Sequence, residues 1–455
     1  MTACDLTPQS LAELSSRGPR YTSYPPATEF KDLPDGGVEL ELARVRDDGA
    51  PISLYVHVPF CRSLCWYCGC NVIPSRDPAR GEHYIDVVAT ELALVAHRLG
   101  AGFPLAEIAL GGGSPNFLSP ASLRTLITAI RRSFAVAHDA RLSVELDPRS
   151  TTTSQLDAFA AAGFRALSVG VQDFSPAVQD AIHRHQTATQ TRWLIERARA
   201  IGFTDANVDI VYGLPRQTEE TFARTLDSVI ALAPDRIALF GYAHLPDKLP
   251  HQRLVERAGR VLDRYERASL LLLGIDKLTA AGYLHLGLDH FARPGSALAR
   301  AAAERRMARS FQGYVEHRAD TIVGVGTTAI SSTPRMFWQN RGELAGWEDD
   351  IAAARLPIAR GVALDADDQL RRALIERLMC DGEVDLASIG ARFGVAADRY
   401  FARELAEVRA RPELAEVVPD SLVVRATPIG KLLVRNVCMV FDRYYRGGDR
   451  FSSTI

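Results

Sequence analysis

The 455-residue sequence lacks a long hydrophobic run and an excess of basic charge. Its most continuous apolar stretch, Leu270–Leu273, gives way to Asp276 and Lys277 and is too short to span a bilayer. No secretory signal follows Met1, so we expect a cytoplasmic protein without a membrane partner. The formal net charge of −2 gives no indication of a nucleic-acid partner. The length predicts two or three domains.

Lysine is also scarce, with only Lys31, Lys248, Lys277 and Lys431 among the 53 basic residues. Compositional bias of the genome is the plainer explanation. The planar fork of arginine nevertheless suits carboxylates better than an ammonium group does. The bias is therefore compatible with a substrate that carries several carboxylates.

Cysteine is sparse except in one segment, where Cys61, Cys65, Cys68 and Cys70 fall within ten residues. In a reducing compartment such clustering indicates metal or redox chemistry. The CxxxCxxC spacing of the first three can hold three corners of a [4Fe–4S] cube and leave one iron open. A four-cysteine zinc site and a disulfide pair are the alternatives. We favour the cluster because four cysteines on one tight loop reach a single ion poorly, and Cys70 is left as a neighbour rather than a ligand.

Strand and helix patterns alternate from residue 51 onward, which predicts a parallel sheet with right-handed crossovers. The expected strands are Ile52–Val58, Glu107–Leu110, Leu142–Leu146, Ala166–Val171, Asn207–Val211 and Arg236–Phe240, and the order continues through Tyr283–Gly287 and Thr321–Gly324. The expected helices include Glu82–Arg98, Ser122–Phe134, Thr189–Ile201 and Glu219–Ala231.

Polar and glycine-rich residues recur where these strands end, namely Cys61–Cys68, Gly111–Ser114, Glu145, Asp147, Gln172, Asp173, Asp209 and Tyr242–His244. Active sites of βα-barrels lie at the carboxyl ends of the strands. The recurrence therefore favours a partial parallel βα-barrel, of the TIM-like type, over an open doubly wound sheet.

These strand ends could serve an S-adenosylmethionine that chelates the open iron and is cleaved to a 5′-deoxyadenosyl radical. The glycines of Gly111–Ser114 would let backbone groups approach the cofactor closely, or they form a plain tight turn. Glu145 and Asp209 could accept hydrogen bonds from ammonium or ribose groups, or they are solvated or cap helices. Arg184 could clamp a carboxylate, although the sequence by itself favours a solvated helix residue.

The two ends of the chain follow other patterns. Residues 1–50 show no regular periodicity, and Gly18–Pro26 should be extended because proline disfavours helix before it. After residue 360 we expect helices at Asp365–Cys380, Leu386–Phe393, Ala397–Val408 and Pro428–Arg446, with a strand pair at 417–418 and 422–424. We predict an N-terminal arm (1–50), a catalytic domain (51–350) and a small helical, winged-helix-like domain (360–455) with a packing or lid role.

With these residues assembled, the chain resembles the oxygen-independent coproporphyrinogen III dehydrogenases (oxidases), which are radical S-adenosylmethionine enzymes of haem biosynthesis. The resemblance extends from Gly18 to the C-terminal helix. The matching segments are GPRYTSYP (18–25), YVHVPFCRSLCWYCGCN (55–71), GGGSP (111–115), ELDPR (145–149), SVGVQDF (168–174), DIVYGLPRQT (209–218), YAHLP (242–246), DHFARP (289–294), FQGY (311–314) and RNVCMVFD (435–442).

The resemblance implies a role for each matching residue. Cys61, Cys65 and Cys68 would bind the cluster, and the family holds two S-adenosylmethionine molecules. The positions at the cluster-bound molecule are Tyr55, Gly112, Glu145 and Ile330, and those at the second are Tyr67, Gly113, Ser114, Gln172, Arg184, Asp209 and Ala243. Glu145, Phe311 and Gln312 are the expected catalytic positions. The GPRYTSYP arm would cover the substrate.

The implied reaction converts two propionates of coproporphyrinogen III to vinyl groups and gives protoporphyrinogen IX without O2. We expect Arg20 and Arg293 to contact substrate carboxylates. An electron donor such as flavodoxin or ferredoxin, an unknown electron acceptor and a monomer are also expected. The main alternative is the related haem chaperone branch, which keeps the cysteine motif but typically has Phe where Cys70 stands and lacks the arm. A zinc-bound structural or DNA-binding protein is the alternative from another class.

Overall fold

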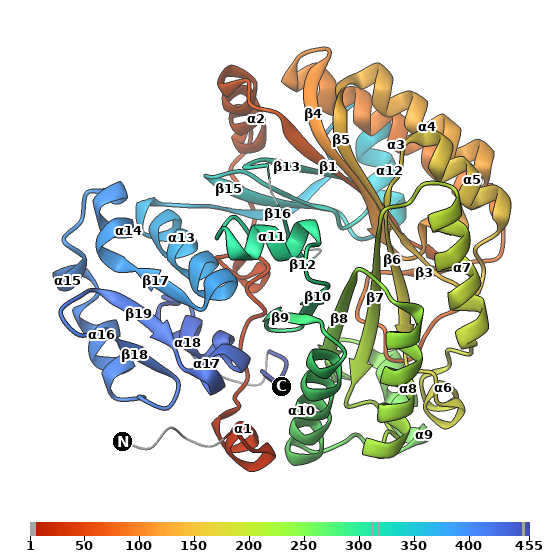
Figure 1. The fold of residues 1–455 in the computed structure, drawn as a ribbon. Coiled ribbons are helices and arrows are strands. Elements are labelled where there is room, and N and C mark those ends of the chain that lie inside the picture. Colours follow the sequence, from red (N-terminus) through yellow and green to blue (C-terminus); the bar gives the residue numbers. More distant parts are fainter. Residues whose placement is uncertain (1–5, 311–312, 317–318, 448–450) are drawn as a thin grey trace.

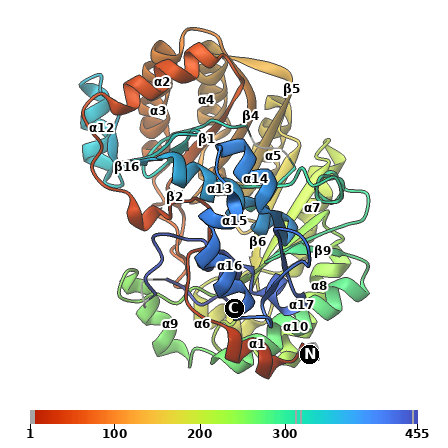
Figure 2. The same ribbon diagram turned by 90° about the vertical axis from the view of Figure 1, so that its left-hand side faces the viewer.

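The computed structural model describes residues 6–310, 313–316, 319–447 and 451–455. It shows a large α/β domain beside a smaller C-terminal domain, with the N-terminal segment running between them (Figure 1). Figure 2 shows the same chain from the side on which the C-terminal helices face the viewer. No helix among the described residues combines the length and the apolar character that crossing a membrane requires.

The centre of the large domain is a curved, mainly parallel sheet. The parallel strands follow the chain order β1 (Ile52–Val58), β4 (Phe103–Gly112), β5 (Phe134–Leu146), β6 (Ala166–Gln172), β7 (Asp205–Tyr212) and β8 (Arg236–Gly241), and β13 (Ile322–Val325) lies parallel to β1 on its other side. Antiparallel strands extend both edges, with β14 (Ile330–Ser332), β15 (Met336–Asn340) and β16 (Ile358–Ala363) beyond β13, and β10 (His290–Ala292) and β9 (Leu284–Gly287) beyond β8.

The predicted partial barrel is confirmed, since β16 and β9 stand at opposite ends of the strand order and the sheet stays open. The predicted strand at Tyr283–Gly287 forms, but placing it in the parallel series was wrong. It is β9, an edge strand that pairs antiparallel with β10. α10 carries the chain from β8 to β9, but β10 follows β9 and takes the place next to β8, so β9 has only an antiparallel neighbour.

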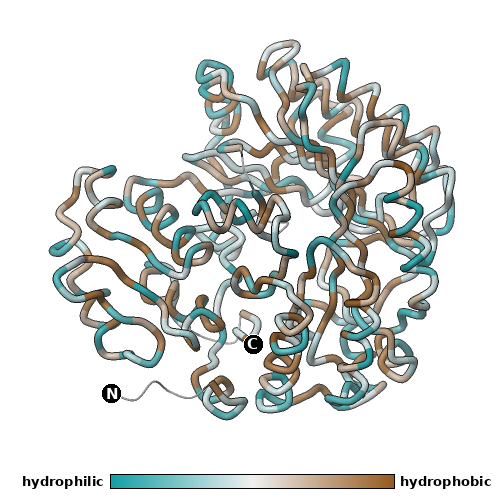
Figure 3. The backbone as a smooth tube through the Cα atoms, in the orientation of Figure 1, coloured by the Kyte–Doolittle hydropathy of each residue, from teal (hydrophilic) through white to brown (hydrophobic). Residues whose placement is uncertain are grey.

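Helices cover the outer face of the sheet, as the alternating pattern predicts (Figure 1). They are α3 (Pro78–Leu99), α4 (Pro120–Ser133), α5 (Thr153–Ala162), α6 (Pro176–Ile182), α7 (Ala188–Ala200), α8 (Glu219–Leu232), α9 (Arg253–Ala258) and α10 (Arg264–Ala280), with α11 (Ala297–Ala303) and α12 (Leu344–Ala352) later in the chain. Each of the longer helices buries one apolar stripe, for example Leu123, Leu126 and Ile130 of α4. In Figure 3 the apolar colour follows the sheet and the helix faces turned toward it.

An ion-pair network fills the amino-terminal end of the barrel interior. Arg141 contacts Glu107 at 3.3 Å and Asp205 at 3.0 Å, and Arg236 contacts Asp205 at 2.7 Å. Ser53 donates to Glu107 at 3.0 Å. Paired charges thus occupy this end, and Arg141, Asp205 and Arg236 also line a cavity of about 720 Å³ there.

The N-terminal segment contains two helices that the sequence analysis missed, α1 (Pro8–Leu14) and α2 (Gly37–Asp48). Thr7 caps α1 in a capping box, and Val38, Leu42 and Val45 of α2 face the core. These helices are short, and α2 carries only a narrow apolar stripe. The segment Gly18–Pro26 contains no regular helix or strand, as its prolines predict.

The C-terminal domain packs helices on a three-stranded sheet. Its elements are α13 (Ala366–Asp381), β17 (Glu383–Asp385), α14 (Leu386–Phe393), α15 (Ala397–Tyr400), α16 (Ala402–Arg409), β18 (Ala415–Val417), β19 (Val423–Ala426), α17 (Pro428–Leu432) and α18 (Val434–Val440). The strand order β17-β19-β18 agrees with a winged-helix-like domain. Two predicted helices are each broken, Ala397–Val408 at Phe401 and Pro428–Arg446 at Leu433, and the second ends at Val440.

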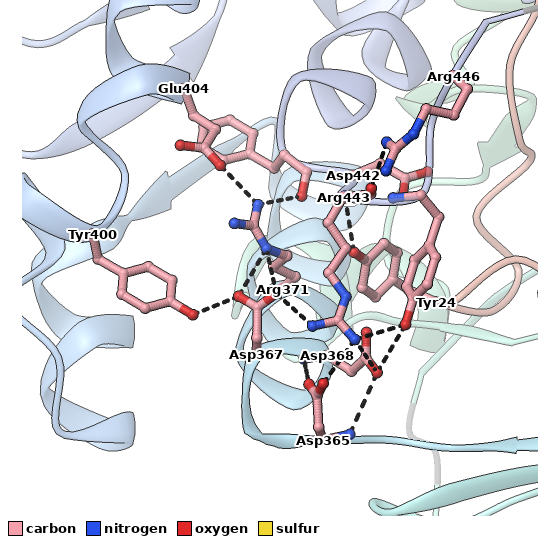
Figure 4. Close-up of polar contacts among 12 residues, drawn as sticks. Tyr24, Asp365, Asp367, Asp368, Arg371, Tyr400, Glu404, Asp442, Arg443 and Arg446 are labelled. Carbon is pink, nitrogen blue, oxygen red and sulfur yellow. Dashed lines mark hydrogen bonds and ion pairs between the residues drawn. The ribbon is translucent and has the colours of Figure 1, made fainter.

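A polar network ties the C-terminal domain to the N-terminal segment (Figure 4). Arg443 binds Asp367 at 2.9 Å and Asp368 at 3.0 Å, and its backbone N–H donates to the Tyr24 hydroxyl at 3.2 Å. Tyr21 donates to Asp442 at 3.0 Å. The extended segment is thus held by the end of the last helix, far away in sequence.

Candidate active site

The cysteine loop leaves the carboxyl end of β1 and is closed at its base. The short strands β2 (Phe60–Cys61) and β3 (Ile73–Pro74) pair there, and Ser75 N donates to Cys61 O at 2.8 Å. Cys61, Cys65 and Cys68 are free thiols that line one cavity of about 170 Å³. The spacing in the sequence therefore brings the three sulfurs to one place.

Most residues expected at the cofactors line the same cavity. Besides the three cysteines they are Tyr67, Gly112, Gly113, Ser114, Glu145, Gln172, Arg184 and Asp209. They come from the carboxyl ends of β4, β5, β6 and β7, from the cysteine loop and from the turn after α6. The open end of the barrel is therefore where the candidate residues gather.

Two guanidinium groups flank Cys65. Arg149 Nη2 and Arg184 Nη1 each lie 3.5 Å from Cys65 Sγ. Asp147 holds both, at 2.6 Å from Arg149 and 3.5 Å from Arg184. Although burial opposes ionisation, Arg184 and Arg149 hold the pKa of Asp147 below its ordinary value. Two cations therefore lie beside the sulfur of the second cysteine.

The other two cysteines lie in different electrostatic surroundings. Hydrogen bonding from Cys70 lowers the pKa of Cys68 to about 6, and Cys70 N also donates to Cys68 Sγ at 3.5 Å. Burial raises the pKa of Cys61 to about 11, although Ser114 Oγ lies 3.5 Å from its sulfur. Cys70 lines the same cavity as the other three cysteines, and its interpretation as a neighbour rather than a ligand stays a prediction.

Two partly buried carboxyl groups line the same cavity as the cysteines. Burial raises the pKa of Glu145 to about 7, and the nearby Asp209 raises it further. Gly112 N donates to Glu145 at 3.3 Å, while Asn207 and Ser168 donate to Asp209 at 2.7 and 3.1 Å. Burial also raises the pKa of Asp209. Such acceptors suit a ligand that brings ammonium or hydroxyl groups.

The glycine turn after β4 packs directly against its surroundings. A Cβ at Gly111 would lie 2.9 Å from the Glu145 carboxylate, and one at Gly112 would lie 2.5 Å from the His57 ring. A Cβ at Gly113 would lie 2.7 Å from the backbone of Pro59 and Phe60, beside the first cysteine. These glycines therefore let the turn and the cysteine loop approach each other closely.

Gln172 and Arg184 depend on unusual backbone conformations. Gln172 has φ of 67° and the residue before Arg184, His183, has φ of 53°. Left-handed backbone at residues other than glycine is costly and is often found at functional sites. His183 ends α6 and stacks on Trp66 at 5.0 Å, which turns Arg184 inward, where it is 7% exposed and donates to Gly170 O at 2.6 Å.

Three expected residues lie outside this cavity. Tyr55 and Ile330 line a neighbouring cavity of about 350 Å³ together with His57. The segment after the cysteines separates the two cavities, because Gly69 and Asn71 face one and Cys70 and Val72 face the other. Ala243 is joined to the cysteine loop through Gln252, which donates to Ala243 O at 3.1 Å and to Tyr67 O at 3.0 Å.

Comparisons with known proteins assign the chain to a family. The model of the radical SAM superfamily matches residues 55–229, and that of the HemN C-terminal domain matches residues 364–413. The oxygen-independent coproporphyrinogen III oxidase of Pseudomonas aeruginosa is 38% identical over 449 residues, with 96% of each chain covered. The chain belongs to the oxygen-independent coproporphyrinogen III oxidase family.

Two further comparisons agree with this membership. The oxygen-independent coproporphyrinogen III oxidase of Escherichia coli is 39% identical over 432 residues, which covers 94% of this chain and 93% of that protein. The solved structure of the Escherichia coli coproporphyrinogen III oxidase, described as a radical SAM enzyme, has a TM-score of 0.90 at 36% identity. That match covers 98% of this chain and 100% of that one. The predicted family and fold class are therefore confirmed.

The remaining residues expected at the site of this oxidase family are Phe311, Gln312, Arg293 and Arg20. Phe311 and Gln312 lie outside the described residues. Arg293 follows β10 at the amino-terminal end of β8, since Ala292 pairs with Arg236, so the expectation that Arg293 reaches a substrate at the open end is wrong. Arg20 lies over the Phe240 ring at the open end. The sequence analysis did not single out Arg149, Ser168 or His251, although His251 lies 2.8 Å from Cys68 O.

The donor set fits a [4Fe–4S] cluster. Three free thiols from one loop line a single cavity, and buried acceptors face them. Each thiolate of such a cluster binds a different iron, so one loop suffices. Cys61, Cys65 and Cys68 are the residues that would hold it, with Arg149 and Arg184 beside Cys65.

Proposed function

We propose that this chain catalyses the oxygen-independent oxidative decarboxylation of two propionate groups of coproporphyrinogen III, which gives protoporphyrinogen IX. The observation that carries the proposal is the convergence of three free thiols and eight further family positions on one cavity, in a chain that matches named oxidases over its length. A cluster with an open iron, when bound, supplies the electron that cleaves S-adenosylmethionine to a 5′-deoxyadenosyl radical.

We propose a separate role for each group of residues, according to where it lies in the site. Cys61, Cys65 and Cys68 hold the cluster. Glu145, whose carboxyl group lines the same cavity, accepts a hydrogen bond from the ammonium group of a cluster-bound S-adenosylmethionine. Tyr55 and Ile330 line the neighbouring cavity. Asp209 and Arg184, with Tyr67, Gly113, Ser114, Gln172 and Ala243, serve a second cofactor molecule. Phe311 and Gln312 complete the catalytic positions that family resemblance assigns.

Contacts between the N-terminal segment and the C-terminal domain support the domain roles that we propose. Residues 1–50 form an arm over the active site, and the domain after residue 360 anchors that arm through Arg443 and Asp442. The reaction removes electrons from the substrate, so an electron acceptor is required, and a protein donor such as flavodoxin or ferredoxin reduces the cluster. We propose a monomer in the cytoplasm.

Anaerobic reconstitution followed by incubation with coproporphyrinogen III, S-adenosylmethionine and a reductant tests the function. We expect about four irons per chain, protoporphyrinogen IX and 5′-deoxyadenosine. One zinc per chain and no iron would contradict the cluster.

Variants make the test specific. Cys65→Ala should lose iron and turnover, whereas Cys438→Ala, in a fully buried thiol of α18, should keep both if it folds. Bound haem without turnover would favour the haem chaperone instead. The presence of Cys70 and of the GPRYTSYP segment favours the oxidase.

A further inference from the structure

Four arginine side chains gather where the arm crosses the carboxyl end of β8. Arg20 lies on the arm, Arg267 on α10, Arg309 on β11 (Ala308–Ser310) and Arg435 on α18. Arg267, Arg309 and Arg435 are 7%, 5% and 4% exposed. Burial lowers the pKa of Arg435 to about 9 and also lowers that of Arg267, and in both cases the charge of Arg20 acts in the same direction. Positive charge is therefore concentrated in a region of low dielectric.

Neutral backbone oxygens are the main partners of this cluster. Arg435 donates to Pro19 O at 2.9 Å and also to Gly18 O, and Arg309 donates to Arg20 O at 3.2 Å. Arg267 donates to Tyr242 O at 2.8 Å and, through Nη2 and Nε, to Ile455 O at 2.6 and 3.2 Å. Among the described residues, Arg20 and Arg435 form no ion pair with a carboxylate side chain. The carboxylate of Asp289 lies close enough to Arg435 to oppose the lowering of its pKa. This single negative charge faces several arginines.

Arg20 is the member of the cluster that lies against the carboxyl end of β8. Its guanidinium group lies 5.7 Å from the centre of the Phe240 ring, and Nη2 makes one long contact of 3.4 Å with Gly241 O. The Phe240 ring packs against the small apolar cluster that also contacts Tyr67 of the cysteine loop. The arm therefore places a cation over an aromatic ring that is joined through this apolar cluster to the cysteine loop.

We propose that Arg20 binds a propionate carboxylate of the substrate and so positions the porphyrinogen ring against the active site. The proposal rests on the proposed function and names the residue that recognises the tetracarboxylate. A carboxylate beside Arg20 would relieve the mutual repulsion of the arginines, and a guanidinium fork can hold both of its oxygens. Arg435 and Arg309 hold the backbone on either side of Arg20, so the fork is fixed before the substrate arrives.

Anaerobic binding of coproporphyrin III, the stable oxidised form of the substrate, tests the proposal. Loss of a charge-assisted hydrogen bond predicts that Arg20→Gln raises the Kd for coproporphyrin III, and the KM for coproporphyrinogen III, about tenfold or more. The affinity for S-adenosylmethionine should not change. Arg20→Lys keeps the charge without the fork and should recover part of the loss.

Arg293→Gln is the matched control, because it removes a guanidinium from the opposite end of the barrel and should bind as the wild type does. Equal thermal midpoints and equal trypsin cleavage of the arm in Arg20→Gln and the wild type would show that the arm is intact. If the wild type converts coproporphyrinogen III and Arg20→Gln binds coproporphyrin III unchanged, the Arg20 proposal is overturned. If the wild type binds coproporphyrin III through Arg20 but forms no product, the proposed function fails while the carboxylate site stands.

Discussion

Replacing Gly113 with alanine tests whether the glycine turn shapes the cysteine loop. The new Cβ would lie 2.7 Å from the backbone of Pro59 and Phe60, and those atoms cannot rotate away. Two hydrogen bonds hold this contact, Gly113 N to Val58 O at 2.8 Å and Ser114 N to Phe60 O at 2.9 Å. Overpacking costs about 1–3 kcal/mol and each weakened hydrogen bond about 0.5–1.5 kcal/mol. The free energy of unfolding should therefore fall by about 2–6 kcal/mol.

Gly102→Ala at the other end of the same strand is the control. Gly102 has φ of +71° with nothing within 4 Å of a Cβ, so alanine there costs about 1 kcal/mol from backbone strain alone. Urea unfolding measures both costs, and iron content with S-adenosylmethionine binding measures the site. We expect Gly113→Ala to lose iron and to bind the cofactor roughly tenfold or more weakly, while Gly102→Ala keeps both. Equal iron content and affinity in the two variants would refute the close-packing argument.

Two further predictions concern charge. Glu145 has a pKa of about 7 in the ligand-free protein, and an ammonium ligand favours its ionised form. The affinity for S-adenosylmethionine should therefore rise with pH through 7 and be about tenfold weaker at pH 6 than well above 7. Glu145→Gln should retain only the titration of the ligand itself, as calorimetry at several pH values can show. Arg443→Gln leaves the Asp368 carboxylate, 1% exposed, without its cation and should cost about 2–4 kcal/mol of stability in urea. Arg224→Gln, in an exposed pair with Glu220, should cost less than about 0.5 kcal/mol; equal losses would contradict the role of burial.

Local pattern was enough for the parallel sheet because each strand and each crossover helix has its own periodic signal. The six strands from Ile52 to Gly241 all form, although β4 begins four residues and β5 eight residues before the predicted bounds. The signal for α2 was present but narrow, since Val38, Leu42 and Val45 are spaced along one face. The breaks at Phe401 and Leu433 have no such signal, because neither glycine nor proline occupies those positions.

Long-range contacts explain why the partners that hold the arm could not be predicted from the sequence. Tyr21 and Asp442 are 421 residues apart, and Arg435 reaches Pro19 over 416 residues. No periodicity links such positions, and the arginine cluster arises only when four separate segments meet at the end of β8. The cysteine cavity was more accessible to prediction, because parallel strands bring their carboxyl ends to one edge whatever the intervening helices contain.

Arg184 shows how a local pattern can mislead at a functional site. Its neighbours His183 and His185 suggest a solvated stretch of helix, and His185 does pair with exposed Asp180 at 2.8 Å. The helix nevertheless ends at Ile182, because His183 adopts φ of 53° and its ring is held between Trp66 and the Leu64 carbonyl. The cysteine loop thus fixes the turn that directs Arg184 inward. The guanidinium group of Arg184 in turn contacts Cys65 Sγ of the same loop. Loop and arginine determine each other's position, so neither conformation follows from its own segment.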